Sequence, residues 1–89
     1  MTEYLEYKTV AAMQTLNTLI GLPKQRARVK FDNKNELREV AEVVRDYAVM
    51  RDVLFDTLVI EDEAIITLTN ASKLVFVLKE NSVIKFVKR

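Results

Sequence analysis

The part of the chain from Leu54 onward constrains the fold most, because its strand-like runs are joined by turns of about three residues. Runs rich in β-branched and aromatic residues cover Leu54 to Ile60, Ala64 to Thr69, Lys73 to Lys79 and Val83 to Lys88. Such short turns cannot hold a crossover, so consecutive runs are expected to pair as antiparallel neighbours. This region therefore predicts a meander of four strands.

The N-terminal part predicts two helices. Apolar residues recur at i, i+3 and i+4 from Thr2 to Ile20, and Gly21 and Pro23 follow as stop signals, with Gly21 expected in the left-handed conformation. A second helix is expected to begin after Asn33, whose side chain can cap the first turn, and to run to about Met50.

Between the two helices, Lys24 to Phe31 alternate strictly and predict one more strand. This strand either pairs in parallel with the meander through the second helix or lies at a sheet edge. The fold class expected is a single α+β domain of order α-β-α-β-β-β-β. Its mainly antiparallel, five-stranded sheet is packed by two helices.

The composition excludes several kinds of chemistry. The 89 residues include no His, no Cys and one Gly, so there is no imidazole base, thiolate nucleophile or Gly-rich phosphate loop. The acidic turn Glu61-Asp62-Glu63 is expected to be a solvated turn rather than a cation site. We expect no enzyme, no cofactor and no metal. The lack of cysteine and of a long apolar run predicts a cytoplasmic protein without a membrane span.

The predicted strand between the helices is the candidate nucleic-acid contact. Its cations Lys24, Arg26, Arg28 and Lys30 would project from one face about 6.6 Å apart, close to the phosphate spacing of a single strand. The alternative is that they are solvated and protect an edge strand. The acidic segment from Asp32 to Glu63, with a net charge of −6, favours the alternative because it would repel a polyanion or neutralise the cations.

The first predicted helix is a candidate protein interface. No charge occurs between Lys8 and Lys24, and one flank of this helix carries small or neutral side chains. The interface residues predicted there are Tyr7, Ala11, Gln14 and Thr18. The alternative is that this flank faces water.

The C-terminal strands offer a second candidate interface. Val75, Val77 and Val87 are expected to form a lysine-framed patch on the sheet face opposite Phe76 and Phe86. This arrangement requires the last two strands to form a hairpin in which Lys79 flanks Val83.

These features together predict a small non-enzymatic binding protein that regulates, inhibits or connects an unknown protein partner, and we expect it to be a homodimer. Its size and lack of catalytic groups suit an accessory protein of a phage or another mobile element. Nucleic-acid binding through Lys24 to Lys30 is the alternative function.

Overall fold

The helices and strands of the computed structural model follow the order α-β-α-β-β-β. The structure describes residues 2–60 and 62–79, with residues 2–6 described by their backbone alone. Helix α1 spans Thr2–Ile20, and the remaining elements are β1 (Arg26–Phe31), α2 (Lys34–Met50), β2 (Leu54–Ile60), β3 (Glu63–Leu68) and β4 (Lys73–Leu78).

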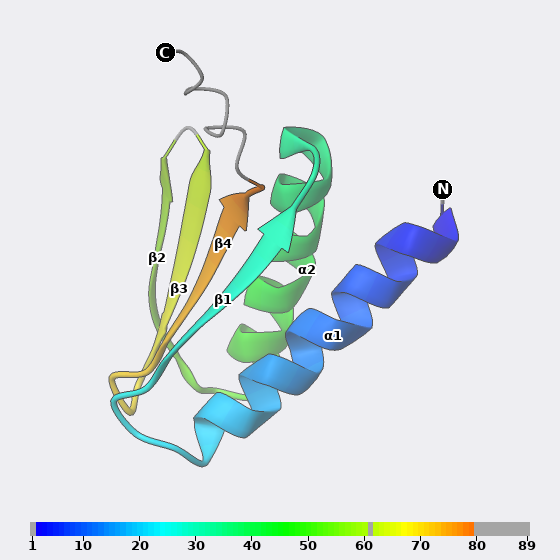
Figure 1. Cartoon of the computed structure of the whole chain (residues 1–89). Helices are drawn as coiled ribbons and strands as arrows, with labels where there is room; N and C mark the ends of the chain where they lie inside the picture. The colour runs from blue at the N-terminus through cyan, green and yellow to red at the C-terminus, as the bar shows by residue number, and fades with distance from the viewer. Residues whose placement is uncertain (1, 61, 80–89) are drawn as a thin grey trace.

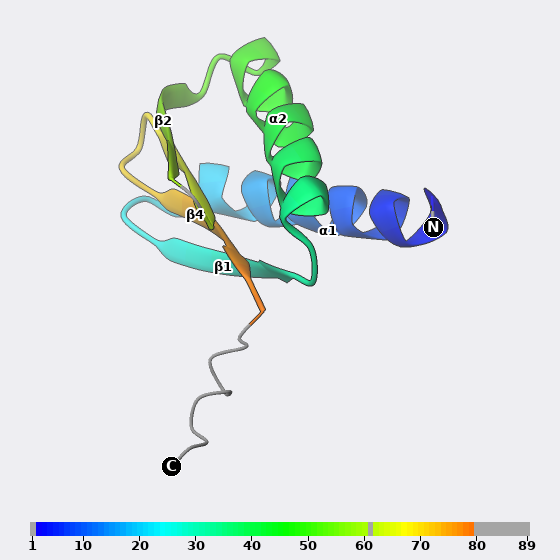
Figure 2. The ribbon, with the colours of Figure 1, turned by 90° about the horizontal axis from the view of Figure 1, so that it is seen from above.

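The four strands form one mixed sheet in the order β1-β4-β3-β2. β2 with β3 and β3 with β4 are antiparallel pairs, as the short turns predict, whereas β1 runs parallel to β4. Both helices pack on the same side of the sheet (Figures 1 and 2). The other side, which we call the open face, is covered by neither α1 nor α2. The chain is thus a single compact α+β domain.

The pairing of β1 agrees with both alternatives. β1 is parallel to a meander strand and also lies at a sheet edge, and its neighbour is β4 rather than β2, the strand that follows α2 in the chain. β4 therefore has a strand on each side. The predicted strand Val83 to Lys88, with Phe86, Val87 and the pairing of Lys79 with Val83, lies outside the described residues. Its predicted hairpin with β4 has no free edge of β4 to use.

The core lies between the sheet and the helices, and it confirms the predicted apolar stripes. Phe31 and Phe76 are fully buried, and their rings stack with centroids 5.7 Å apart. The buried helix residues that face them are Ala12, Leu16, Leu19, Leu37, Val40, Ala41, Val44 and Ala48. α2 begins as predicted, because the side chain of Asn33 accepts hydrogen bonds from the backbone N–H groups of Asn35 and Glu36.

The C-terminus of α1 is not capped by a left-handed Gly21 as predicted. Gly21 does not take a positive φ, and its N–H donates to the Thr18 carbonyl in a tight last turn. The side-chain amide of Asn70 donates to the carbonyls of Leu19 and Ile20, which are orphan acceptors at the helix end. The β3–β4 turn therefore holds α1 in place.

Ser72 belongs to the same turn and is completely buried. Its hydroxyl donates to the Leu22 carbonyl and accepts from the Gln25 N–H. Its role is therefore structural, and it ties the β3–β4 turn to the chain between α1 and β1.

Candidate binding surfaces

Three of the four predicted cations lie side by side on the open face. β1 turns Ala27 and Val29 toward the helices, so Arg26, Arg28 and Lys30 are exposed on the opposite side. Their alternation places neighbouring charges about 6.6 Å apart along the strand. The prediction that these three side chains share one face is confirmed.

Lys24 is not part of this row. It lies in the turn before β1 with a φ of 62°, and its N–H donates to the Asn70 carbonyl at 3.2 Å. The strand begins at Arg26, two residues later than predicted. Lys73 of β4, which is the register partner of Arg26, brings a further cation to this part of the open face.

The β1 cations have no ion-pair partner among the described residues. The ion pairs found there join Lys34 to Asp62, Arg45 to Asp46 and Lys79 to Asp32. α2, which carries four of the ten acidic residues between Asp32 and Glu63, lies on the other side of the sheet (Figure 2). The fold thus separates the β1 cations from these four carboxylates, whereas Asp56 and Glu63 share the open face with the cations.

The centre of the open face is apolar. Val75 and Val77 lie there, opposite Phe76, with Val75 only 6% exposed and Val77 half-buried. In the register, Val75 lies between Arg28 of β1 and Ile65 of β3. A solvated face of an antiparallel sheet normally carries polar residues. Here the side chains beside Val75 already cover it, so the exposed apolar surface of this centre is part of Val77 and of Ile65.

The predicted flank of α1 is exposed but offers few free polar groups. Tyr7, Gln14 and Thr18 are exposed, and Ala11 is half-buried. The Thr18 hydroxyl donates to the Gln14 carbonyl one turn earlier at 3.1 Å. The positions of these residues neither support nor contradict the prediction that this flank of α1 is a protein interface.

Asn17, on the same helix, is used to bind α2. Its side-chain oxygen accepts hydrogen bonds from the Tyr47 hydroxyl at 3.2 Å and from the Arg51 guanidinium at 2.7 Å. The Arg51 guanidinium also donates to the Tyr47 hydroxyl at 2.8 Å and favours its phenolate form, so the pKa of Tyr47 lies below its ordinary value. This polar cluster fastens the two helices to each other.

β2 is the second edge of the sheet, and its side chains contrast with those of β1. Four apolar residues of this strand are strongly exposed, namely Phe55 (72%), Leu58 (51%), Val59 (59%) and Ile60 (49%). β2 has no basic residue and no proline, which are the residues that commonly prevent an edge strand from pairing with another chain. The register shift between Leu54 and Asp56 is the one irregularity in its pairing with β3.

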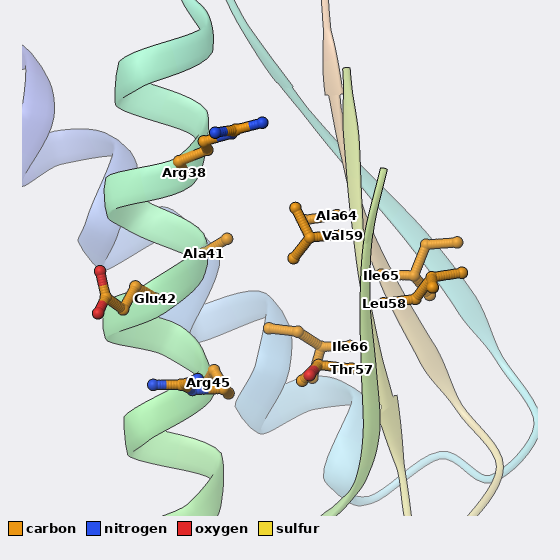
Figure 3. A pocket seen from close by; sticks show the side chains of 10 residues that line it. All are labelled: Arg38, Ala41, Glu42, Arg45, Thr57, Leu58, Val59, Ala64, Ile65 and Ile66. Carbon is orange, nitrogen blue, oxygen red and sulfur yellow. The ribbon is translucent and has the colours of Figure 1, made fainter. Parts of the chain in front are cut away.

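A groove of about 290 Å³ runs between α2 and β2 on the helix side of the sheet. Figure 3 shows Thr57, Val59 and Ile66 pointing toward α2, and Arg38 extending from α2 toward the strands. Arg45 turns away and pairs with Asp46 at 2.8 Å. The residues that line this β2 groove are Arg38, Ala41, Glu42, Arg45, Thr57, Leu58, Val59, Ala64, Ile65 and Ile66.

The sequence analysis did not identify β2 or its groove as a site. The available signal was the run Leu54 to Ile60, in which apolar residues fall on both faces and only Asp56 is charged. A strand with two apolar faces is usually central. Here β2 lies at an edge with one face along the groove.

Two general features complete the description of these surfaces. Among residues 2–60 and 62–79, no group of three or more acidic side chains is placed to hold a metal ion. Within the same part of the chain, no helix has both the length and the apolar character needed to cross a bilayer.

Comparisons with protein-family models, curated proteins and solved structures found no match to this chain, so the functional proposal depends on its surfaces alone.

Proposed function

We propose that this chain is a non-enzymatic binding protein that acts through protein–protein contacts and takes up an extended segment of its partner along β2. The observation that carries the proposal is the exposed apolar edge of β2 beside the groove. An edge strand offers a row of backbone N–H and C=O groups, and a partner strand can pair with them.

The side chains around β2 define what the partner segment needs. In a strand added next to β2, alternate side chains point into the groove, where Val59 and Ile66 present apolar surface. The side chains between them lie beside Leu58 and Ile60 on the open face. The segment should therefore carry apolar residues in both sets of positions.

Arg38 adds a charge preference. It is exposed, reaches toward the strands and makes no ion pair with another described residue. A carboxylate at the matching position of the partner could form a charge-assisted hydrogen bond with it. A protein with such a site would regulate, inhibit or connect its partner by masking a segment of it, and a cytoplasmic setting fits the lack of cysteine.

A library of displayed random peptides tests this proposal. The expected enrichment on the wild-type protein is an extended sequence of apolar residues with one Asp or Glu. Val59→Lys should weaken binding of the enriched peptide at least about tenfold, because about 1 kcal/mol of side-chain burial is lost and a charge enters the groove. Arg38→Ala should remove the acidic preference.

The matched control is Val43→Lys, because Val43 is 42% exposed on α2 and does not line the groove. This variant should bind the peptide like the wild type. Equal loss in both lysine variants, or peptides that bind without regard to Val59, would contradict strand addition at β2.

Nucleic-acid binding is the second candidate function, and one observation favours it. Arg26, Arg28 and Lys30 share the open face with Lys73, and none of them is paired with a described acid. The positions of β1, β3 and β4 on this face carry no aromatic residue, so contacts would be made to phosphates rather than to bases. Such binding would be indifferent to sequence.

Salt-dependent anisotropy with single-stranded DNA and RNA tests this alternative. Arg26→Ala and Arg28→Ala should each lower the salt slope by about one, because each lost phosphate contact releases one counterion fewer. If the wild type shows no binding at about 0.15 M salt, the basic strand serves another purpose.

A further inference from the structure

The open face carries a charge gradient from one edge to the other. Its basic side is β1, with Arg26, Arg28 and Lys30, and its acidic residues are Asp56 on β2 and Glu63 on β3. The apolar centre lies between them. Because α2 and α1 are on the other side of the sheet, this gradient is presented without cover from either helix (Figure 2).

The strand registers place these residues in rows across the sheet. One row runs from Arg26 through Lys73 and Thr67 to Asp56, so its two ends carry opposite charges. The next row runs from Arg28 through Val75 and Ile65 to Leu58. A surface with opposite charges at its two margins and an apolar centre can be complementary to a copy of itself.

The direction of the two-fold axis decides whether the charges match. An axis parallel to the strands lays β1 of one copy over β2 of the other, so that Arg26 meets the partner's Asp56. Arg28 then lies over Leu58, and Lys30 lies over Ile60, one strand away from Glu63. An axis in the sheet plane but perpendicular to the strands lays β1 over β1, where cations meet cations. Charge therefore selects the axis along the strands, which is compatible with the aligned packing of two sheets.

We propose that the open faces of two copies of this chain pack together around a two-fold axis parallel to the strands. Arg26 then lies over the partner's Asp56, and Val75 lies over the partner's Ile65. Sheets packed in this way are about 10 Å apart, a gap that an arginine and an aspartate side chain can bridge together. The apolar centres lie in the middle of the interface, where the partly exposed Val77 and Ile65 supply the contact and Val75 is only 6% exposed.

The area of the open face determines how strongly two copies are expected to associate. Four strands of about six residues give a footprint of roughly 19 by 20 Å, or about 400 Å² per copy, which is about half of what a standard stable interface buries on each partner. We therefore expect a weak dimer, with a dissociation constant in the micromolar range. This interface lies on the open face and the β2 groove on the helix side of the sheet, although Leu58 and Ile65 contribute to both. Arg26 and Val59 each belong to one surface alone, so Arg26→Glu and Val59→Lys test the two proposals separately.

Sedimentation velocity at about 50 µM protein tests the arrangement. The wild type should be a dimer, whereas Arg26→Glu and Asp56→Lys should each weaken association by at least about tenfold, because each puts two like-charge contacts into the interface. An equimolar mixture of the two variants should recover the dimer. In that mixed dimer, both margins again place opposite charges over each other.

The control is Arg38→Glu, which reverses a charge on α2 and should leave the dimer intact. Far-UV circular dichroism of each variant checks that the fold is kept. A wild type that is monomeric at this concentration overturns the proposal, and so does a mixture that stays monomeric. If Arg26→Glu leaves the mass unchanged and abolishes nucleic-acid binding, the basic margin contacts phosphates and the dimer proposal is wrong.

Discussion

Replacing Phe76 with alanine should remove a large part of the stability of this domain. Phe76 is fully buried, and its ring stacks on that of Phe31 with an interplanar angle of 22°. Deleting a buried phenylalanine ring costs about 3–5 kcal/mol. The free energy of unfolding of a chain of this length is about 4–13 kcal/mol. The variant should therefore be close to unfolded or clearly destabilised.

Urea unfolding followed by far-UV circular dichroism measures this cost. Phe55→Ala is the matched control, because it makes the same chemical change at a side chain that is 72% exposed. We expect the control to cost less than about 0.5 kcal/mol. Equal costs for the two variants would show that the assignment of faces in β2 and β4 is wrong.

A double-mutant cycle extends the test to the pairing of the strands. Phe31 belongs to β1 and Phe76 to β4, and their rings meet because these two strands are neighbours in the sheet. The coupling free energy of the two alanine variants should be about 0.5–1.5 kcal/mol. A coupling of zero would refute the placement of β1 next to β4.

Three further predictions concern the turns and the helix contacts. Ala71→Gly should stabilise the fold by up to about 1 kcal/mol in urea unfolding, because Ala71 has a φ of 73°. Asn33→Ala should destabilise it by about 1 kcal/mol in the same assay, because the N-cap of α2 is lost. Arg51→Ala should raise the pKa of Tyr47 in a titration of phenolate absorbance, because the guanidinium donates to the Tyr47 hydroxyl at 2.8 Å and stabilises the phenolate. The lowered pKa of Tyr47 adds stability that is complete above the unfolded pKa of about 10 and is lost as the pH falls through the folded pKa.

Local signals in the sequence were sufficient to predict both helices and the four strands of the described residues. The i, i+3, i+4 spacing located both helices, and Asn33 caps α2 as expected. Alternation located β1, although the turn at Lys24 shortens it. These features depend on neighbours along the chain, and for that reason they can be read from the sequence.

The order of the strands could not be predicted in the same way. β1 and β4 are separated by α2 and the β2–β3 hairpin, so their pairing depends on which edge of the meander is free rather than on any local pattern. One clue was present in Leu74 to Leu78, which is apolar on both faces, as central strands often are. The sequence analysis interpreted Val75 and Val77, which form one of these two faces, as a surface patch.

The candidate sites also divide into features that follow from the local sequence and features that depend on the tertiary structure. The cations of β1 were placed on one face by their alternation alone. The exposure of Val59 and the groove beside it follow from the edge position of β2 and from how far α2 covers the sheet. Both are properties of the tertiary structure, so no motif in Leu54 to Ile60 could show them.

Amide hydrogen exchange, measured residue by residue with and without a saturating peptide enriched on the wild-type protein, tests strand addition most directly. If a partner segment pairs with β2, every second amide from Leu54 to Ile60 should exchange more slowly with the peptide bound, because these N–H groups gain a carbonyl partner. The amides of β1 should be unchanged. Slower exchange confined to β1, or no change along β2, would contradict the proposal that β2 is the binding edge.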